Sequence, residues 1–528
     1  MVHRSVTSLL IVVVTSMVSL AAPPTVTGLF PAGGQRGTTF EIAASGTLDP
    51  WPAKVWASHP GIVAKAAAEK GKVTVAVAAE TPLGVHYLRF HNKDGADALR
   101  PFVVGTLLEL LEKEPNDSPS TAQVIEASAV VNGRLAKSGD VDCFAVTLKH
   151  GQTLIASAVA NATLGSPMDS VLQIATPSGV VLSQNHDYRG LDPQIAFVAP
   201  SDGTYIVRYF AFPSQPDSSI RYAGGDGYIY RLTLTTGAFL DYARPMATSQ
   251  QSNDSVALHG WNIPEVSRSI KLTAIDLPSS LLTVGNAPNA IALQREPHPC
   301  YDCTVTNSNR ILEAPFTLTG RLDKPIATYA FRAIKGKALH IRLKVGTPDR
   351  VMTSTMRILD SEGKTLVRVE PPALDADCET TFVPPADGVY RLEVRDLYGK
   401  SGTRYVFSLR VVPSEPDFGM TVTADRFALT PGKPLDVPVT IVPKNGFKQD
   451  VVLNATNLPA GVLATTVLPI GKPSSVVTLR FTAEKSIDSF AFHIVGTVKG
   501  QAKILRVAGV VGTGVDGLNE NLWLTVKE

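Results

Sequence analysis

The chain has 528 residues, enough for several independent domains at roughly 100 to 200 residues each. Its 49 basic and 47 acidic side chains nearly cancel, which excludes the strong positive field of a nucleic-acid-binding or membrane-surface protein. Charged residues are only 18% of the chain, below the usual figure of about 25%, while glycine (41) and proline (38) are plentiful. This composition is typical of many short strands joined by turns.

The first 21 residues have the pattern of an export signal. His3 and Arg4 precede an apolar stretch from Leu9 to Val18, and small residues lead to the favoured cleavage point after Ala21. The apolar stretch is too short to span a bilayer, and no later segment offers about 18 continuous apolar residues. We therefore expect an exported protein without a membrane span in its mature form, located in the periplasm, at the cell surface or outside the cell.

Period-two patterns dominate the rest of the chain. In Leu339–Val345 apolar and polar residues alternate strictly, which predicts an antiparallel strand with one face in a core. Glycine-containing turns such as Ser201-Asp202-Gly203 recur between such stretches, and long helical periodicity is absent. The expected fold class is all-β, with tandem β-sandwiches in five units: 22–108, 109–236, 237–292, 293–412 and 413–528. The unit at 237–292 looks like a shortened relative of the first.

The chain carries one of these units twice. The stretch from Phe197 to Tyr205 answers to that from Phe382 to Tyr390, and the triplet starting at Gly133 answers to the one starting at Gly320. The spacing far exceeds that of solenoid repeats, so a whole domain is duplicated, at 109–236 and 293–412.

Only the first copy keeps a full set of acidic residues. Calcium takes six to eight oxygen ligands, several of them from carboxylates. Alternate spacing aims the first three of the candidates to one side of an extended segment. A solvated acidic linker followed by a polar turn is the alternative interpretation. The oxygen-bearing residues of the two short segments are Glu112, Glu114, Asn116, Asp117, Asp140 and Asp142.

The second copy has lost most of this set. Aligning Leu293–Pro299 with Leu111–Asp117 leaves only Glu296 from the first segment, with Gln294 and His298 at two of the other positions. The Asp140–Asp142 region corresponds to 325–328, which contains no acidic residue. We therefore expect a degenerate calcium site in the second copy.

These motifs carry a family resemblance. The Glu-Pro-Asn-Asp segment, the Gly-Arg-Leu strand, Gly139–Phe144 and Ala199–Tyr205 together resemble the bacterial pre-peptidase C-terminal domain, a jelly-roll-like sandwich found on secreted proteases and similar to the collagen-binding domains of clostridial collagenases. The resemblance covers 109–236 and, with decay, 293–412. Residues 22–108 resemble an IPT/TIG domain and 413–528 an immunoglobulin-like domain. The whole arrangement resembles large exported proteins of planctomycete-type bacteria.

The resemblance implies a ligand set and a class of target. It implies calcium at the six residues named above, and binding to an extracellular protein or polysaccharide surface. The aromatic candidates for such binding are in contexts that look like loops or sheet edges, but core packing is the better interpretation for them. They are Tyr188, Tyr209, Phe210 and Phe212.

Four cysteines leave the disulfide pattern open. Cys300 and Cys303 form a CxxC without a second ligand pair for zinc, so a local disulfide or two free thiols is the better interpretation. Cys143 lies in a strand pattern and is most simply a small buried hydrophobe. The pairing of Cys378 is not determined by the sequence.

No motif of a catalytic domain is present. The chain has no HExxH, no GxSxG and no Walker loop. The small β domains expected along the chain leave no room for a conventional protease or hydrolase domain. We therefore expect a non-catalytic exported binding or adhesion protein, with calcium ordering the first copy of the duplicated domain. The alternatives are an accessory or targeting subunit of a secreted peptidase or hydrolase, and a purely structural envelope spacer.

Overall fold

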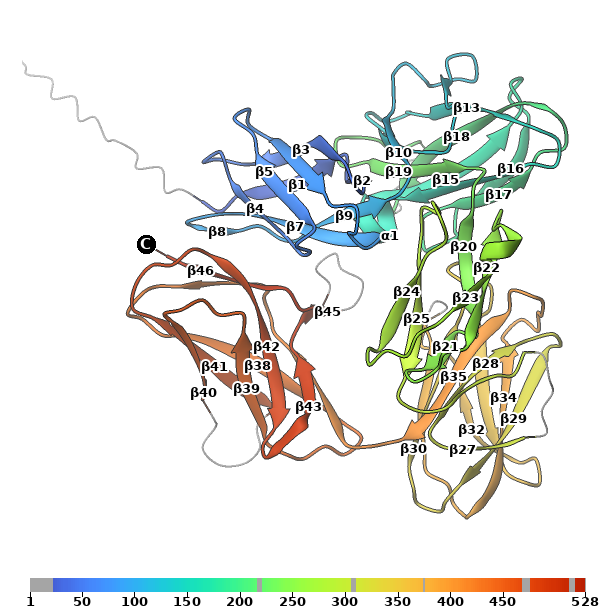
Figure 1. The fold of residues 1–528 in the computed structure, drawn as a ribbon, viewed down its shortest axis with the longest axis vertical. Coiled ribbons are helices and arrows are strands. Elements are labelled where there is room, and N and C mark those ends of the chain that lie inside the picture. The colour runs from blue at the N-terminus through green and yellow to red at the C-terminus, as the bar shows by residue number, and fades with distance from the viewer. Residues whose placement is uncertain are drawn as a thin grey trace, which may run out of the picture.

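The computed structural model describes residues 22–215, 221–304, 310–373, 376–467, 475–511 and 518–527. The expected export signal, residues 1–21, lies outside these ranges. Within them the chain is almost entirely β, as the alternating patterns predict, and its helical segments are α1 (Asn161–Leu164) and the 3-10 turn η1 (Glu265–Ser267). No helix in these ranges has the length and apolar character needed to cross a bilayer. Five two-sheet sandwiches follow one another along the chain, and the last returns to the first (Figure 1).

The first sandwich closes over a small aliphatic core. Val73 and Val75 are fully buried while Thr74 between them is exposed, as alternation along a strand requires. Its first sheet has the order β1 (Thr25–Phe30), β3 (Thr39–Thr47), β6 (Lys72–Val77) and β5 (Ile62–Ala66). Its second sheet has the order β2 (Gly33–Gln35), β9 (Arg100–Gly105), β7 (Gly84–Asn92) and β4 (Lys54–Ala57), with β8 (Gly95–Ala96) paired to β7.

The second and fourth sandwiches have the same strand order in both of their five-stranded sheets. In the second sandwich one sheet has the order β10 (Leu108–Leu111), β12 (Ala129–Arg134), β19 (Ile229–Thr235), β14 (Thr153–Val159) and β17 (Gln194–Val198). The other sheet has the order β11 (Gln123–Val124), β13 (Asp142–Leu148), β18 (Gly203–Pro213), β15 (Met168–Ala175) and β16 (Val181–Asn185). In the fourth sandwich one sheet has the order β26 (Cys300–Asp302), β28 (Phe316–Arg321), β35 (Val406–Pro413), β30 (Leu339–Val345) and β33 (Cys378–Phe382). The other sheet has the order β27 (Ile311–Glu313), β29 (Ile326–Ala333), β34 (Gly388–Asp396), β31 (Ser354–Leu359) and β32 (Thr365–Val369).

The duplicated Asp-Gly-x-Tyr motif makes the same hydrogen bonds in both copies. The Tyr205 hydroxyl donates to the Ser201 carbonyl at 2.8 Å, and the Tyr390 hydroxyl donates to the Ala386 carbonyl at 2.7 Å. In each copy the aspartate one residue before the glycine accepts a backbone N–H from the facing turn. The motif therefore locks the turn that leads into the central strand of one sheet.

The third sandwich is a reduced version of the first. Gly46 and Gly260 take the same place in the two units, since each has positive φ and its Cβ would lie about 2 Å from a carbonyl oxygen of the paired strand. Its sheets are β20 (Phe239–Arg244), β22 (Ser255–Trp261), β23 (Ser269–Lys271), and β21 (Ala247–Ser249), β25 (Ile291–Glu296), β24 (Ser279–Leu282). Residues 291–296 therefore pair within the third sandwich, and the strands of the fourth begin at β26.

The last sandwich has its own core. It contains the fully buried Leu453, Leu479 and Phe492. Its sheets are β36 (Asp417–Thr421), β38 (Leu435–Lys444), β41 (Val476–Ala483), β40 (Val462–Val467), and β37 (Arg426–Leu429), β46 (Leu522–Val526), β42 (Phe490–Val498), β39 (Val451–Thr456), with β43 (Gln501–Val507) on β42 and a ribbon of β44 (Val510–Val511) and β45 (Leu518–Asn519).

A buried ion pair joins the last sandwich to the first. Arg89 Nη2 on β7 donates to Asp425 Oδ2 at 2.8 Å, and both side chains are almost fully buried. Arg89 also donates to the carbonyls of Asp97 and Asn521, at 3.2 and 3.1 Å. Trp523 on β46 covers the pair, with its ring 4.6 Å from that of His91. The chain of sandwiches is therefore closed into a ring.

Candidate metal centre

The acidic residues of the second sandwich converge at one end of its two sheets. The segment after β10 supplies Glu114, and the turn into β13 supplies Asp140 and Asp142. Carboxylate oxygens of these three residues all lie within 4.8 Å of one another. Asp140 and Asp142 are 1% and 0% exposed, whereas Glu114 faces solvent. Half of the expected ligand set is thus placed together by the fold.

Asn116 points its side-chain amide into the same cluster. The amide atom that faces inward lies 3.1 Å from Asp142 Oδ1 and 3.2 Å from Glu114 Oε2. With nitrogen inward the amide donates to both carboxylates; with oxygen inward three oxygen-bearing groups face one another, an arrangement that a cation stabilises. The backbone N–H of Asn116 also donates to Glu114 Oε2 at 3.0 Å.

Asp140 has one oxygen that the protein does not satisfy. Its Oδ2 accepts the backbone N–H of Ala136 at 2.5 Å, but its Oδ1 is buried without a hydrogen-bond partner. Buried polar atoms are nearly always paired, so an orphaned carboxylate oxygen needs an explanation. Burial raises the pKa of the Asp140 carboxyl, and the nearby carboxylate of Asp117 raises it further. A bound cation would satisfy the orphaned oxygen and relieve this repulsion.

Tyr230 on β19 holds the inner side of the cluster, and the sequence interpretation missed it. Its hydroxyl donates to Asp142 Oδ2 at 2.5 Å and lies 3.1 Å from Glu112 Oε2. The other Glu112 oxygen accepts the backbone N–H of Arg134 at 2.7 Å. Gly133 makes this approach possible, because a Cβ there would lie 2.1 Å from the Tyr230 ring and 2.5 Å from Glu112. Glu112 is therefore a neighbour of the three-carboxylate group rather than a member of it.

Burial and mutual repulsion make the cluster electrostatically unfavourable on its own. Burial is the main cause that raises the pKa of Asp142, and the charge of Glu112 raises it further. Burial likewise raises the pKa of Glu112 and of Asp140. Such shifts follow when several carboxylates share a desolvated site. Carboxylate and amide oxygens on irregular segments are the donors that calcium prefers, so the residues present fit that ion.

The strand register changes the correspondence between the two copies. Glu112 N–H donates to the Asn132 carbonyl at 3.0 Å, and Cys303 N–H donates to the Thr319 carbonyl at 2.8 Å, at matching positions of β12 and β28. Cys303, not Gln294, is therefore the equivalent of Glu112, and the alignment with Leu293–Pro299 is wrong. That stretch looks similar because Pro297 directly follows Glu296, the last residue of β25, so that a Glu-Pro pair again precedes a new sandwich.

The corrected register still leaves the fourth sandwich without the inner ligands. Asp142 pairs with Tyr209 in the second sandwich, and Ala327 pairs with Val394 at the matching place in the fourth. Ala327 is therefore the equivalent of Asp142, and Pro325 is the equivalent of Asp140. Tyr230 pairs with Gly133 in the same way that Phe407 pairs with Gly320. The tyrosine-to-phenylalanine difference between the two matched strands is the signal in the sequence that points to Tyr230.

The aromatic residues expected at loops or edges are elsewhere. Tyr209 and Phe210 lie in β18, between β13 and β15, and both are buried, so the edge context is wrong for them. The Tyr209 hydroxyl donates to Ser170 Oγ at 2.7 Å inside the core. Phe212 is half-buried against Phe210 and Tyr222. These three rings pack the second sandwich and do not form an open binding face.

Tyr188 belongs to an ion-pair hub between three sandwiches. Arg404 of the fourth sandwich donates to Asp241 at 2.8 Å, to Asp349 at 2.7 Å and to the Tyr188 hydroxyl at 3.0 Å. Its guanidinium also lies 5.7 Å from the Trp261 ring centre. Tyr188 thus positions the second sandwich against the third and fourth.

Two of the four cysteines lie in hydrophobic clusters of the second and fourth sandwiches. Cys143 and Cys378 are fully buried thiols, and burial raises the pKa of Cys143 to about 11. Cys300 is also a thiol, with Sγ 3.7 Å from the His298 carbonyl, so the local disulfide with Cys303 is not formed. His298 itself is buried and hydrogen-bonds Thr317 Oγ1 at 2.9 Å.

One curated protein shares a stretch of sequence with this chain. A stretch of 96 residues is 35% identical to a probable subtilase-type serine protease of Deinococcus radiodurans, and it makes up 18% of this chain. The match covers 13% of that protease, so the chain spans a small part of its relative.

Several solved structures are similar to parts of this chain. The pre-peptidase C-terminal domain of a Bacillus anthracis collagenase matches 22% of this chain and 97% of its own, at 16% identity and a TM-score of 0.16. The D0-D1 domain of intimin matches 35% of this chain and 92% of its own, at 10% identity and a TM-score of 0.14. Domains 1–6 of the surface layer protein SbsC match 74% and 55%, at 13% identity and a TM-score of 0.14. TM-scores this low carry no functional information.

The family model of the bacterial pre-peptidase C-terminal domain matches residues 140–210. This range runs from Asp140 in the acidic cluster to Phe210 in the central strand β18. At residues 140–210 the chain therefore contains a pre-peptidase C-terminal domain.

Proposed function

We propose that the chain is a non-catalytic exported binding protein in which one calcium ion orders the second sandwich. The observation that carries the proposal is the group of Glu114, Asp140 and Asp142, with the orphaned buried oxygen of Asp140 at its centre. Pre-peptidase C-terminal domains accompany enzymes as accessory modules, and the match at 140–210 supports a binding role.

The calcium ion would be held by the three carboxylates and the amide oxygen of Asn116, with Asp117 beside Asp140. Glu112 and Tyr230 would hold Asp142 from the inner side. The ion supplies positive charge that keeps the buried carboxylates of Asp140 and Asp142 ionised, and it ties the segment after β10 to the start of β13. Since β10 also adjoins the first sandwich, this order extends to the junction between the two units.

The partner we propose is an extracellular protein or polysaccharide surface. The export pattern of residues 1–21 and the balanced charge of the chain support a target outside the cell and not a nucleic acid. The fourth sandwich repeats the strand order of the second without its inner ligands, so we propose that it is a second, metal-free domain of the same family. For the first and last sandwiches we propose IPT/TIG-like and immunoglobulin-like domains, in a protein of planctomycete-type bacteria.

A second function is favoured by one observation. A stretch of this chain is 35% identical to part of a protein described as a protease. The chain would then act as an accessory or targeting subunit of a secreted peptidase or hydrolase. Activity of a peptidase on an insoluble substrate, measured with and without the purified chain, would separate this role from simple adhesion.

Thermal unfolding of the full chain tests the calcium proposal. We expect millimolar calcium to raise the Tm above that in EDTA, because a ligand at about 100 times its Kd stabilises the folded state by about 2.7 kcal/mol. The double variant Asp140→Asn, Asp142→Asn should lose this rise. Glu362→Gln, an exposed carboxylate in a turn of the fourth sandwich, is the matched control and should keep it. An equal response of all three proteins, or none in the native chain, would refute the proposal.

A further inference from the structure

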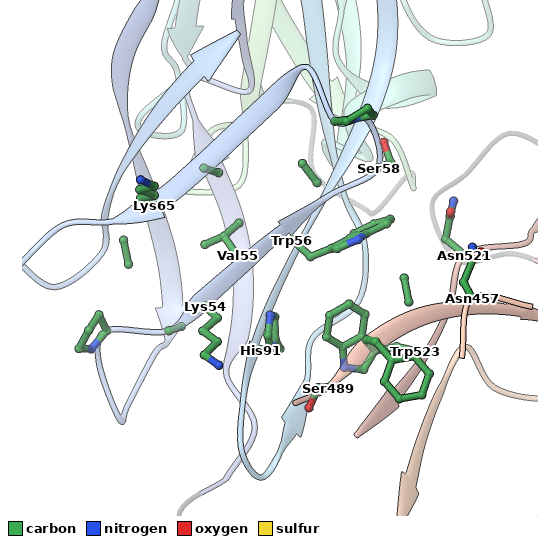
Figure 2. Close-up of a pocket in the computed structure, with 18 of the residues that line it drawn as sticks. Lys54, Val55, Trp56, Ser58, Lys65, His91, Asn457, Ser489, Asn521 and Trp523 are labelled. Carbon is green, nitrogen blue, oxygen red and sulfur yellow. The ribbon is translucent and has the colours of Figure 1, made fainter. Parts of the chain in front are cut away.

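A groove of about 1150 Å³ separates the first sandwich from the last, beside the Arg89–Asp425 pair (Figure 2). One wall consists of β4 and the turn that follows it. The other wall consists of residues from β42 and β46 together with Asn457. Ordinary small-molecule sites enclose about 300 to 1,000 Å³, so this groove has room for an extended ligand.

The groove has an aromatic floor. The rings of Trp56 and Trp523 meet edge to face, with centroids 6.1 Å apart, and His91 packs on Trp523 (Figure 2). Trp523 is buried, but Trp56 is half-exposed and offers a flat apolar surface to the groove. Phe490 extends this surface on the opposite wall. Burial lowers the pKa of His91 to about 4, so its ring is neutral at ordinary pH.

Several neutral polar groups border this floor. Among the described residues, the Ser489 hydroxyl, the Asn521 side-chain amide and the Trp56 indole N–H have no hydrogen-bond partner. Asn457 Nδ2 lies 3.3 Å from His493 Nδ1, which leaves the amide oxygen of Asn457 available. Both donors and acceptors therefore face the groove from its two walls.

The charges of the groove exclude a cationic ligand. The lining residues include no carboxylate. Lys54 is neutralised by Asp488 across the groove at 2.9 Å. Lys65 lies away from the two indole rings (Figure 2). A ligand that matches this lining is uncharged, carries many hydroxyl groups and has an apolar face.

An added peptide strand fits less well. Extended peptides bind by pairing with a long open edge of a sheet. The edge strand here, β4, has four residues and is bracketed by Pro52 and Pro60. Short edge strands with flanking prolines are a known means of preventing such pairing.

We propose that this groove binds a neutral oligosaccharide. The C–H faces of its pyranose rings would pack on Trp56, and its hydroxyls would exchange hydrogen bonds with Ser489, Asn457 and Asn521. The proposal rests on the binding role given above and names its ligand class and its site, but it does not depend on calcium. Since the two walls come from opposite ends of the chain, the ligand would bridge the closure of the ring.

Isothermal titration of the full chain with cellohexaose, chitohexaose, mannohexaose and the acidic hexagalacturonate tests the proposal. We expect at least one neutral hexamer to bind and to quench tryptophan fluorescence. Trp56→Ala should weaken that binding about tenfold, since aromatic contacts contribute up to about 1.5 kcal/mol. Ser489→Ala, which removes only a hydroxyl, should weaken it severalfold and guards against a folding defect in the first variant.

Trp261→Ala is the matched control, because Trp261 is a half-buried tryptophan of the third sandwich outside the groove. It should leave the affinity unchanged, and so should EDTA. Absence of binding by every neutral hexamer at millimolar concentration would overturn the proposal. Binding of hexagalacturonate alone, Trp56-dependent binding of extended peptides instead, or binding that survives both groove variants would also overturn it. A failure of the calcium test leaves this titration unaffected, so the two proposals fail separately.

Discussion

Tyr230→Phe removes one oxygen atom from the acidic cluster and tests whether that cluster is a metal centre. The lost hydroxyl donates to Asp142 Oδ2 at 2.5 Å and lies 3.1 Å from Glu112 Oε2. The ring itself fits, because the fourth sandwich has Phe407 at the same register. The variant therefore changes hydrogen bonding and not packing.

The size of the effect follows from these contacts. A hydrogen bond to a charged, buried group contributes about 1.5 to 3 kcal/mol. Loss of a partner that orients a metal ligand lowers metal affinity about 10- to 100-fold, which corresponds to about 1.4 to 2.7 kcal/mol. The two figures agree, so we expect the calcium Kd of Tyr230→Phe to rise by one to two orders of magnitude.

Calcium titration of the full chain by calorimetry measures this Kd directly. Tyr205→Phe is the control, since its hydroxyl donates to the Ser201 carbonyl at 2.8 Å in the same sandwich but away from the carboxylates. It should lower the free energy of unfolding by about 1 kcal/mol and leave the Kd unchanged. Native affinity in Tyr230→Phe, or an equal loss of affinity in both variants, would refute the assignment of Tyr230 to a metal centre.

Three further predictions concern pH and the contacts between sandwiches. In EDTA the Tm should rise as the pH falls from about 9 to about 5. The pKa values of Glu112 and Asp142 are higher in the folded state, so protonation of these groups stabilises the fold, and this stabilisation is lost as the pH rises through the folded pKa. Saturating calcium should reduce the trend, and a Tm that falls on acidification would contradict the prediction. Arg89→Met should weaken the contact between the first and last sandwiches by about 3 kcal/mol, since it leaves Asp425 buried without its main partner; urea unfolding followed by tryptophan fluorescence should show an earlier transition, and an unchanged curve would mean that the pair does not hold the ring. Arg404→Ala should cost about 2 kcal/mol through lost hydrogen bonds to charged groups; small-angle scattering should then report a more open particle, whereas native dimensions would show that the hub is dispensable.

The sequence predicted the parts of the fold that depend on local patterns. Alternation along stretches such as Leu339–Val345 identified strands, because side-chain direction in a strand has a period of two. The duplicated Asp-Gly-x-Tyr motif located the second and fourth sandwiches, since its aspartate and tyrosine make the same turn contacts in each. The residues that form the cluster, Glu114, Asn116, Asp140 and Asp142, were among the six candidates that the family resemblance implied.

The errors arose where long-range pairing decides. Which residue of the fourth sandwich matches Glu112 depends on the register of β26 against β28. The Glu-Pro pair at the end of β25 resembles the one in the second sandwich and suggested a wrong alignment. Tyr209 and Phe210 were placed in a loop or edge context, but β18 lies between two neighbouring strands and both side chains are buried. The contact of Arg89 with Asp425 has no local signature at all, since 336 residues separate them.

That separation gives the ring an order of assembly. Transport led by an amino-terminal export signal delivers Arg89 before Asp425, which lies 336 residues later in the chain. During this interval the first sandwich can complete its own core while the surface around Arg89 waits for a partner not yet made. An arginine at the centre of that surface remains hydrated while it waits, whereas an apolar patch would invite aggregation. The ion pair therefore makes a weaker contact between the two sandwiches than an apolar surface would. It also keeps the first sandwich soluble until the last sandwich has folded.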